Sequence, residues 1–282
     1  MLTALSPSLN SLPASFLNVQ SQYSEIYAII SPPRCSSTAF ARVFWQHPDI
    51  GYYSHEPFEV TYYMGQGLTE VAAKLNNPLD LNQFNSKQNA TQGNSLVIKE
   101  MPYQVWHNFP LLVTLVKKPI IFLIRDPRLN ITSRITKKRE AGTSTTFPHV
   151  ETGWQLLHQQ VAYCQNHDIP YTIVDTTDFR NAPNAIVPQV FSLLGLKFSP
   201  AMLFWKPRAE VELDNLDGAH SHLYERVLSS VGIQPATEPI PSLDSFPVRN
   251  QFRAHVAHCL ELYQELRRDP HRIRLTSSIR LS

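Results

Sequence analysis

The sequence predicts an α/β fold of three layers, in which helices cover both faces of a central parallel sheet. Short, strongly apolar runs alternate along the chain with segments of helical periodicity. Runs this apolar are typical of strands buried on both faces, and helices between such strands form the crossovers that join parallel neighbours. Ligands of such sheets bind at the carboxyl ends of the strands.

The predicted elements begin after Tyr23. Strands are expected at IYAII (26–30), SLVIK (95–99), PIIFLI (119–124) and YTIVD (171–175). Helices are expected near 37–46, 128–140, 150–167 and 184–194, with further helical patterns near 219–230 and 247–268. Residues 1–22 are interrupted by Ser, Pro and Asn and are expected to form a flexible arm before a single domain over 23–282. Within that domain, residues 60–94 form a polar insertion with one helix near 68–75.

The composition excludes several classes of protein. The 282 residues, 43% of them hydrophobic, are enough for the core of one domain, and no apolar run approaches the length of a membrane span. A formal net charge of +2 is too small for a general nucleic-acid or membrane-surface binder, so any anion recognition should be local. The cysteines Cys35, Cys164 and Cys259 contain no CxxC pair, which argues against a disulfide framework and favours a cytoplasmic setting.

The turn after the first strand has the features of an anion site. It reads Pro33-Arg34-Cys35-Ser36-Ser37-Thr38, and so places one cation and three hydroxyls at the start of a helix. Backbone N–H groups and the positive end of the helix dipole also favour an anion there. The alternative is that the hydroxyls only cap the helix and that Arg34 is solvated.

Two familiar phosphate loops do not fit this turn. A nucleoside triphosphate loop needs glycines, but the first glycine of the chain is Gly51. A phosphatase-like loop needs an Arg six residues after a nucleophilic Cys, yet Ala41 stands six residues after Cys35. Cys35 is therefore not expected to act as a nucleophile.

A second candidate anion site follows the strand at 119–124. Arg125 leaves the strand end, and Ser133 follows eight residues later, about one helical turn into LNITSRI, so both can converge on one phosphate. The alternative is an ordinary strand-to-helix turn in which Asp126 caps the helix and Pro127 occupies its first position. That alternative does not explain the spacing of Arg125 and Ser133.

The two segments together resemble the signature motifs of the sulfotransferase family, whose members bind 3'-phosphoadenosine 5'-phosphosulfate (PAPS). PPRCSSTAFARVFWQHPDI resembles the 5'-phosphosulfate loop, and IIFLIRDPRLNITSR resembles the 3'-phosphate motif. His47-Pro48, Glu56-Pro57-Phe58 and the stretch 171–200 add to a likeness that spans about 26–205. The family loop usually has Gly where Ser36 stands, so Ser36 must adopt a glycine-like backbone or shift the loop. The resemblance implies a P-loop-NTPase-like sulfotransferase fold.

The resemblance also implies roles for individual residues. Arg34 would neutralise the leaving phosphate, and Arg125 with Ser133 would bind the 3'-phosphate. The full set of residues expected to bind the donor is Arg34, Cys35, Ser36, Ser37, Thr38, Arg125 and Ser133. The loop at Trp205-Lys206-Pro207-Arg208 would reach over the cofactor.

Three further residues are expected to serve catalysis. Glu56 is the first choice as the base that removes the acceptor proton, and His55 is the next. The alternative is that Glu56 pins a loop while His55 faces solvent. Lys99 either contacts the sulfonate or pairs with Glu100.

The function expected from the resemblance is in-line transfer of a sulfonate from PAPS to a hydroxyl of a small-molecule acceptor, leaving 3'-phosphoadenosine 5'-phosphate (PAP). Residues 60–94 and 199–282 are expected to form the acceptor side. The alternatives are an inactive nucleotide-binding protein of the same fold or a phosphotransferase. No metal is expected, since neither His220-Ser221-His222 nor the cluster at His255 matches a metal motif. Nucleic-acid and membrane partners are not expected, and the acceptor and any homo-oligomer stay open.

Overall fold

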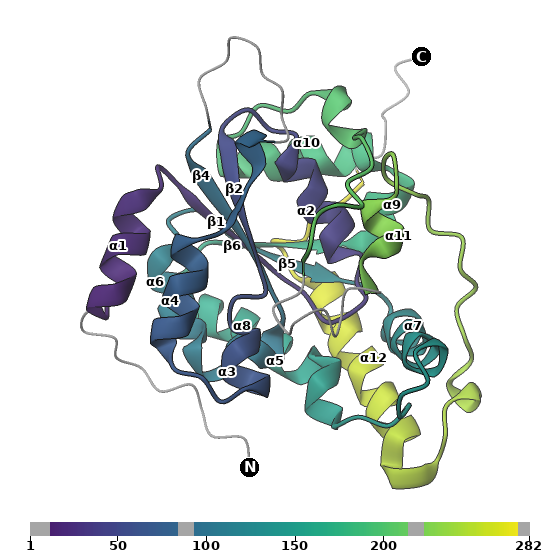
Figure 1. The fold of residues 1–282 in the computed structure, drawn as a ribbon. Coiled ribbons are helices and arrows are strands. Elements are labelled where there is room, and N and C mark those ends of the chain that lie inside the picture. Colours follow the sequence, from purple (N-terminus) through teal and green to yellow (C-terminus); the bar gives the residue numbers. More distant parts are fainter. Residues whose placement is uncertain (1–11, 84–92, 214–222, 276–282) are drawn as a thin grey trace, which may run out of the picture.

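The structure is a computed structural model that describes residues 12–83, 93–213 and 223–275. Its centre is a six-stranded sheet in the order β3-β2-β4-β1-β5-β6, shown in Figure 1. The strands are β1 (Ile26–Ile30), β2 (Ile50–His55), β3 (Leu79–Asp80), β4 (Ser95–Glu100), β5 (Ile120–Ile124) and β6 (Tyr171–Asp175). All neighbours pair in parallel except β3, which runs antiparallel to β2. The four predicted strands and the mostly parallel sheet are confirmed.

Helices cover both faces of the sheet, as the three-layer prediction requires. One face is covered by α1 (Ala14–Gln22), α4 (Leu68–Asn76), α6 (Phe109–Leu115), α8 (Trp154–Asn166) and α12 (Phe252–Arg268). The other face is covered by α2 (Ser37–Trp45), α9 (Thr176–Asn181) and α10 (Pro183–Leu194). The shorter helices are α3 (Glu59–Tyr63), α5 (Pro102–Val105) and α11 (Glu225–Leu228), and α7 (Pro127–Glu140) follows β5.

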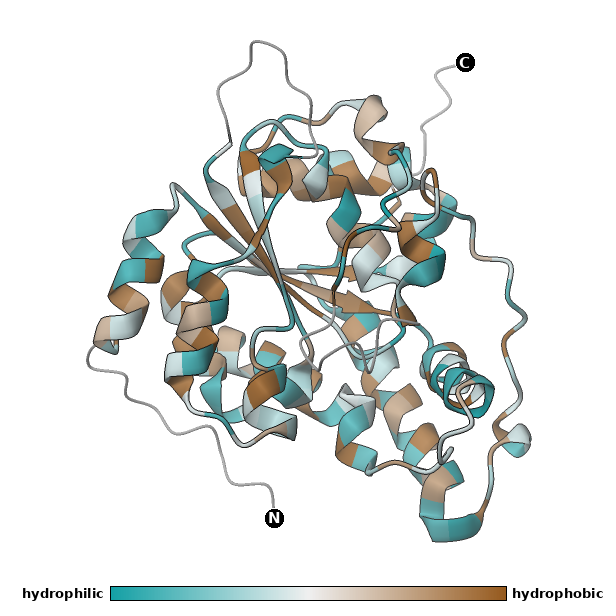
Figure 2. Ribbon diagram, in the orientation of Figure 1, coloured by the Kyte–Doolittle hydropathy of each residue, from teal (hydrophilic) through white to brown (hydrophobic). Residues whose placement is uncertain are grey.

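The strands are apolar throughout because each one contributes to two cores. In β1, Ile26, Ala28 and Ile30 point into the core beneath α1 and α8, while Tyr27 and Ile29 point into the core beneath α2 and α10. Figure 2 shows these central strands as hydrophobic and the surrounding helices as mixed. Burial on both faces explains why the sequence lacks the apolar–polar alternation of a half-exposed sheet.

The predicted helices are present with shifted ends. The helix expected at 150–167 begins only at Trp154, because Gly153 adopts a left-handed backbone (φ 78°) that separates α8 from a 3-10 turn at His149–Thr152. The other 3-10 turns are Leu81–Gln83, Trp106–Asn108, Pro200–Leu203, Leu243–Ser245 and Arg249–Gln251. Of the pattern near 219–230, residues 219–222 lie outside the described ranges, and α11 occupies part of the rest.

The prediction of a flexible arm over residues 1–22 is wrong for its second half. Residues 14–22 form α1, and Phe16 and Val19 of that helix are fully buried in the core that also contains side chains of α4. These two apolar residues are three apart and so lie on one helical face, which is enough to dock a short helix. The first eleven residues lie outside the described ranges.

The topology brings four strand ends together. In the register of the sheet, Ile30 of β1 pairs with Glu100 of β4, and Lys99 pairs with His55 of β2. On its other side, β1 pairs with β5, which leads to Arg125. The segments that carry the predicted site residues therefore start from one edge of the sheet. No helix in the described ranges is long and apolar enough to cross a membrane.

Candidate active site

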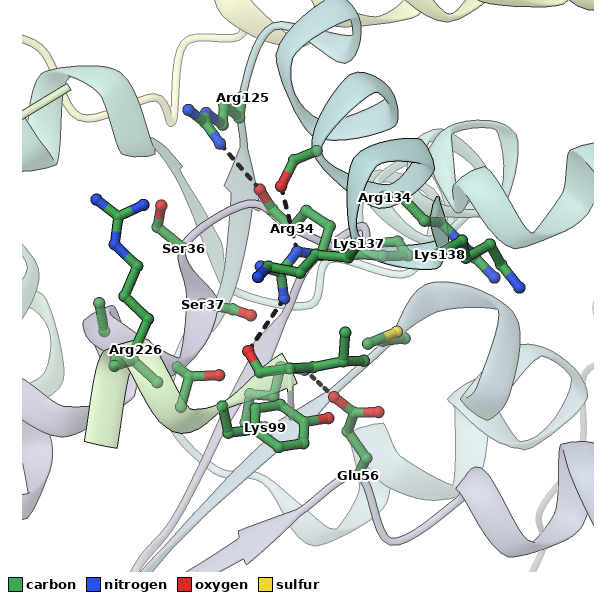
Figure 3. Close-up of a pocket in the computed structure, with 18 of the residues that line it drawn as sticks. Arg34, Ser36, Ser37, Glu56, Lys99, Arg125, Arg134, Lys137, Lys138 and Arg226 are labelled. Carbon is green, nitrogen blue, oxygen red and sulfur yellow. Dashed lines mark hydrogen bonds and ion pairs between the residues drawn. The ribbon is translucent and has the colours of Figure 1, made fainter. Parts of the chain in front are cut away.

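A cavity of about 640 Å³ opens at this edge of the sheet. Figure 3 shows the side chains that converge on it from the β1 turn, β4, α7 and the C-terminal part of the chain. Of the residues predicted from the sequence, those lining the cavity are Arg34, Ser36, Ser37, Thr38, Glu56, Lys99, Arg125 and Ser133. Cys35 and His55 belong to the same segments, but their side chains do not line it.

Ser36 resolves the one departure from the family motif. Its backbone lies in the left-handed region (φ 57°, ψ 23°), so Ser36 adopts the glycine-like conformation. Arg34 is also left-handed (φ 64°). Such conformations cost energy for residues with a side chain and are maintained only by the surrounding structure. Ser36 makes no capping bond with its hydroxyl, so the hydroxyl is not used up as a helix cap.

Cys35 points away from the cavity. The residue is fully buried, and burial raises the pKa of its thiol to about 12. A thiol with this pKa stays protonated at neutral pH, whereas nucleophilic cysteines need a thiolate. The expectation that Cys35 is no nucleophile is therefore supported, and its contribution to the loop is limited to its backbone.

The two predicted anion-binding segments touch each other. Arg125 donates from Nη1 to the carbonyl oxygen of Arg34 at 3.2 Å, and Arg34 donates from Nε to Ser133 Oγ at 3.3 Å. Asn130, one helical turn before Ser133, donates from Nδ2 to the carbonyl oxygen of Pro33 at 3.0 Å. These contacts fix the first turn of α7 against the β1 loop, as the dashed lines in Figure 3 show for Arg34 and Arg125.

The start of α7 also has the ordinary features expected of it. Asp126 caps the helix by accepting a hydrogen bond from the backbone N–H of Arg128 at 2.9 Å, and Pro127 occupies the first helical position. Arg125 is left to face the cavity and is only 5% exposed. Its Nε has no hydrogen-bond partner within the described part of the chain, which leaves a buried donor available for a ligand.

A buried acid–base cluster lies across the cavity from Arg125. Lys99 Nζ forms an ion pair with Glu56 Oε1, and His55 Nε2 lies 3.3 Å from the same oxygen. Gln104 donates from Nε2 to Glu56 Oε2 at 3.0 Å, and Tyr53 OH lies 2.6 Å from His55 Nδ1. Each carboxylate oxygen of Glu56 therefore has a partner, and His55 is buried rather than facing solvent.

The electrostatics keep Glu56 ionised. Burial alone would raise the pKa of its carboxyl, but the Lys99 ammonium and His55 hold that pKa well below its usual range. Lys99 does not pair with Glu100, because successive residues of a strand point to opposite faces. Glu100 instead accepts hydrogen bonds from the backbone N–H groups of Phe58 and Met101. Burial, and then the charge of Glu56, raise the pKa of Glu100 well above its ordinary value.

Comparison with known proteins identifies the family of the chain. A sequence model of the sulfotransferase domain matches residues 25–254, which is most of the chain. The chain belongs to the sulfotransferase family. No protein among the curated sequences matches it.

Several solved sulfotransferase structures are similar to the chain at low identity. The sulfotransferase domain of the Synechococcus PCC 7002 olefin synthase is 15% identical, with a TM-score of 0.49, over 86% of this chain and 96% of that one. A sulfotransferase from Alicyclobacillus acidocaldarius is 14% identical, with a TM-score of 0.48, over 86% and 96%. The mouse sulfotransferase SULT7A1, solved in complex with PAP, is 12% identical, with a TM-score of 0.46, over 91% and 89%.

The cavity of this sulfotransferase is lined mainly by cations. Among the described residues, eight basic side chains but four carboxylates line it. The basic residues are Arg34, Lys99, Arg125, Arg134, Lys137, Lys138, Arg180 and Arg226, and the carboxylates are Glu56, Glu59, Glu151 and Glu238. An excess of positive charge in a concave site favours an anionic ligand. The wall also contains apolar and aromatic side chains, namely Tyr63, Met101, Tyr103 and Phe147.

The sequence-based expectation for Trp205-Lys206-Pro207-Arg208 is not met in the sulfotransferase. None of these residues lines the cavity. The buried guanidinium of Arg42 donates to the carbonyl oxygen of Lys206 at 2.8 Å and lies 5.0 Å from the centre of the Trp205 ring. The segment is therefore held against Arg42 of α2. The residues from this part of the chain that line the cavity come instead from 223–238.

Several residues of the site were not foreseen. Gln104, Asn130, Arg180, Leu223 and Glu238 all contact predicted site residues or each other. Asn130 lies three residues before Ser133, on the same helical face, so its position could have been inferred from the helix. The others come from separate segments, and nothing in the sequence links them to the site.

The histidine clusters do not form a metal site in the part of the chain that the structure describes. No group of three or more His, Cys, Asp or Glu side chains is placed there to hold a metal ion. His255 stacks on His149 with ring centres 4.2 Å apart and lies 3.0 Å from Thr152 Oγ1. His220 and His222 lie outside the described ranges.

Proposed function

We propose that this sulfotransferase uses PAPS as the donor and transfers its sulfonate to a hydroxyl of a small-molecule acceptor. One observation carries the proposal: Arg125, Arg34 and Ser133 form one connected cluster in the same cavity as Lys99 and Glu56. A single nucleotide with anionic groups at the 3' and 5' positions of its ribose can then contact two positively charged sites of the protein. Its reactive 5' end points toward the acid–base cluster.

The residues present fit such a donor. The β1 turn supplies the free N–H groups at the start of α2, together with the hydroxyls of Ser36, Ser37 and Thr38, for the 5'-phosphosulfate. Arg125 offers its Nε, which has no hydrogen-bond partner among the described residues, and Ser133 offers its hydroxyl, to the 3'-phosphate. Two separate anion sites select for a nucleotide that is phosphorylated at both positions.

The proposed chemistry is an in-line displacement at sulfur. The acceptor oxygen forms a bond to sulfur while the bond from sulfur to the bridging phosphate oxygen breaks, and the electron pair of that bond remains on PAP. Arg34 and the loop N–H groups stabilise the charge that develops on the leaving phosphate. As in phosphoryl transfer, most of the catalysis consists of positioning and charge stabilisation.

Glu56 is the proposed base that takes the acceptor proton. Its carboxylate lines the cavity, is ionised at neutral pH, and is fixed by Gln104 and Lys99. The paired Lys99 weakens Glu56 as a base, so a shift of the ammonium from Glu56 toward the incoming sulfonate would strengthen the base when the donor is bound. Lys99 would then bind the sulfonate of the donor and would make Glu56 a stronger base only when the donor is bound.

The acceptor is proposed to bind beside Tyr63, Met101, Tyr103 and Phe147. Tyr63 belongs to the insertion at 60–94, and its hydroxyl lies 3.2 Å from that of Tyr103. A cavity of about 640 Å³ that also holds a nucleotide leaves room for a small molecule rather than for a folded protein surface.

A turnover assay tests the proposed function. The purified protein is incubated with PAPS and a panel of hydroxylated metabolites, and mass spectrometry follows PAP and any acceptor that has gained a sulfonate. We expect PAP and a sulfonated product to appear together, and both to form at least about 100-fold more slowly with the Glu56→Gln variant. A protein that binds PAPS but forms no sulfonated product with any acceptor would instead be the inactive nucleotide-binding alternative.

A further inference from the structure

A carboxylate from the C-terminal part of the chain lies between two buried arginines of the cavity. Glu238 Oε2 is 3.1 Å from Arg125 Nη2, and both carboxylate oxygens of Glu238 are 3.1 Å from Arg180 Nη1. The Arg125 and Arg180 side chains are 6% and 9% exposed, whereas Glu238 is 39% exposed. The two cations are thus part of the cavity wall, and the carboxylate reaches them from the solvent side.

Arg180 is held in place independently of Glu238. It donates from Nε to the carbonyl oxygen of Gln234 at 2.9 Å and from Nη2 to that of Pro235 at 2.6 Å. The backbone N–H of Ala236 donates to Asn181 Oδ1 at 2.9 Å. The segment 234–236 is therefore bound to the end of α9, and Arg180 keeps these contacts when Glu238 turns away.

The ion pairs of Glu238 reduce the electrostatic repulsion between Arg125 and Arg180. Partial burial alone would raise the pKa of Glu238, but a hydrogen bond from its own backbone, followed by the charges of Arg125 and Arg180, lowers that pKa below its ordinary value. Two neighbouring guanidiniums with low exposure repel each other, and an anion between them removes that repulsion. In this structure the anion is a side chain of the protein itself.

We infer that Arg180 is a second arginine of the 3'-phosphate site, and that Glu238 occupies this site until a 3'-phosphorylated nucleotide replaces its carboxylate. The inference rests on the proposed function, since it assigns to Arg125 the phosphate contact argued above. Neither Arg180 nor Glu238 has a sequence signature that would place it at the site.

The exchange is favourable on charge and geometry. A phosphate monoester carries a charge of about −1.5 to −2 at neutral pH and presents three acceptor oxygens, whereas a carboxylate carries −1 and presents two. A phosphate can therefore pair with Arg125 and Arg180 together more strongly than Glu238 does. A nucleotide without a 3'-phosphate has no group to replace the carboxylate and leaves Glu238 in place.

Calorimetric titration of the full chain with PAP and with AMP tests the inference. We expect Arg180→Gln to weaken PAP binding by about tenfold or more and to leave AMP binding unchanged. Removing the competing charge with Glu238→Gln should tighten PAP binding by about three- to tenfold, again without an effect on AMP. Arg208 and Glu210 form a matched surface ion pair that does not line the cavity, so Arg208→Gln and Glu210→Gln should change neither affinity.

The outcomes separate the inference from the proposed function. Equal affinities of the unmodified protein for PAP and AMP would refute both. If PAP binds more tightly than AMP but Arg180→Gln leaves its affinity within about twofold, the second arginine is refuted while the proposed function stands. If Glu238→Gln leaves PAP binding unchanged or weakens it, Glu238 does not compete with the phosphate and the inference is refuted in that part.

Discussion

Arg125 donates a hydrogen bond from Nη1 to the backbone carbonyl oxygen of Arg34 at a distance of 3.2 Å, although the two residues are 91 positions apart in the chain. The contact exists because β1 and β5 are neighbours in the sheet and end at the same edge. It joins the turn proposed to bind the 5'-phosphosulfate to the strand end proposed to bind the 3'-phosphate. The pairing of β1 with β5 therefore holds these two proposed sites next to each other.

The conformation of Ser36 predicts opposite effects of glycine at two neighbouring positions. Ser36→Gly removes a left-handed residue with a side chain, which should offset the added flexibility of the unfolded chain and leave stability unchanged or higher by about 0.5–1 kcal/mol. Ser37→Gly, in the first turn of α2, should lower stability by about 0.5–1 kcal/mol. Urea unfolding of both variants measures this, and a loss of stability in Ser36→Gly equal to that in Ser37→Gly would contradict the assigned backbone.

The position of Glu56 predicts a variant that binds donor but does not turn over. Glu56→Gln keeps the size of the side chain and one acceptor oxygen, and Glu56 lies apart from the residues proposed to bind the 3'-phosphate, so PAP affinity should stay within about threefold of the unmodified protein. Turnover should fall by about 100- to 10,000-fold, because the amide cannot accept the acceptor proton. Steady-state kinetics alongside PAP titration measure both quantities. Activity that survives Glu56→Gln and disappears in His55→Gln would make His55 the base.

Lys99 should behave differently from Glu56. Lys99→Met removes the ammonium from a buried pair and leaves the carboxylate of Glu56 without its main partner, so the variant should lose about 3 kcal/mol or more of stability. The double variant Lys99→Met with Glu56→Gln should recover part of that loss, since it contains no unpaired buried charge. Thermal unfolding of the three variants measures the coupling, and additive losses would show that the pair does not interact as the structure indicates.

The lowered pKa of His255 predicts how the stability of the protein depends on pH. Burial, together with the nearby His149 and His258, lowers the pKa of His255 from 6.5 to about 4. The unfolded chain then binds a proton at His255 before the folded protein does, so the stability from its neutral ring is present above about pH 6.5 and is lost as pH falls toward 4. The loss should be on the order of 1–2 kcal/mol, because the ring is only partly buried.

Urea unfolding between pH 7 and pH 4 measures this dependence. His255→Gln should flatten the curve. If this variant keeps the full pH dependence, the titrating group lies elsewhere.

Much of the fold could be predicted because the strands of a doubly covered sheet are apolar at every position. Runs such as those of β1 and β5 stand out from the polar segments around them. The missed elements include the strongly apolar helix α6, and others that have weaker signals. The helix α1 depends on two apolar residues within a polar stretch, and β3 is a two-residue edge strand. Their positions are decided by tertiary contacts rather than by local pattern.

The residues of the candidate site also fall into those that could be predicted from the sequence and those that could not. Arg34, Arg125 and Ser133 could be predicted because each has a fixed position relative to a strand end or a helix start. Arg180 and Glu238 could not, because they lie on α9 and on an irregular segment that meets the cavity only in the folded chain. Sequence spacing describes residues on one element, whereas contacts between distant segments depend on how those elements pack.

The central claim is that one nucleotide bridges the two anion sites, and titration of PAP and AMP against Arg125→Ala tests it most directly. The unmodified protein should bind PAP more tightly than AMP, and Arg125→Ala should weaken PAP by about 30-fold or more, a loss of about 2 kcal/mol, while AMP binding stays the same. Arg128→Ala, a neighbouring arginine that pairs with Asp126 and does not line the cavity, serves as the control and should change neither affinity. Equal losses of PAP and AMP binding in Arg125→Ala, or equal affinities in the unmodified protein, would contradict the claim.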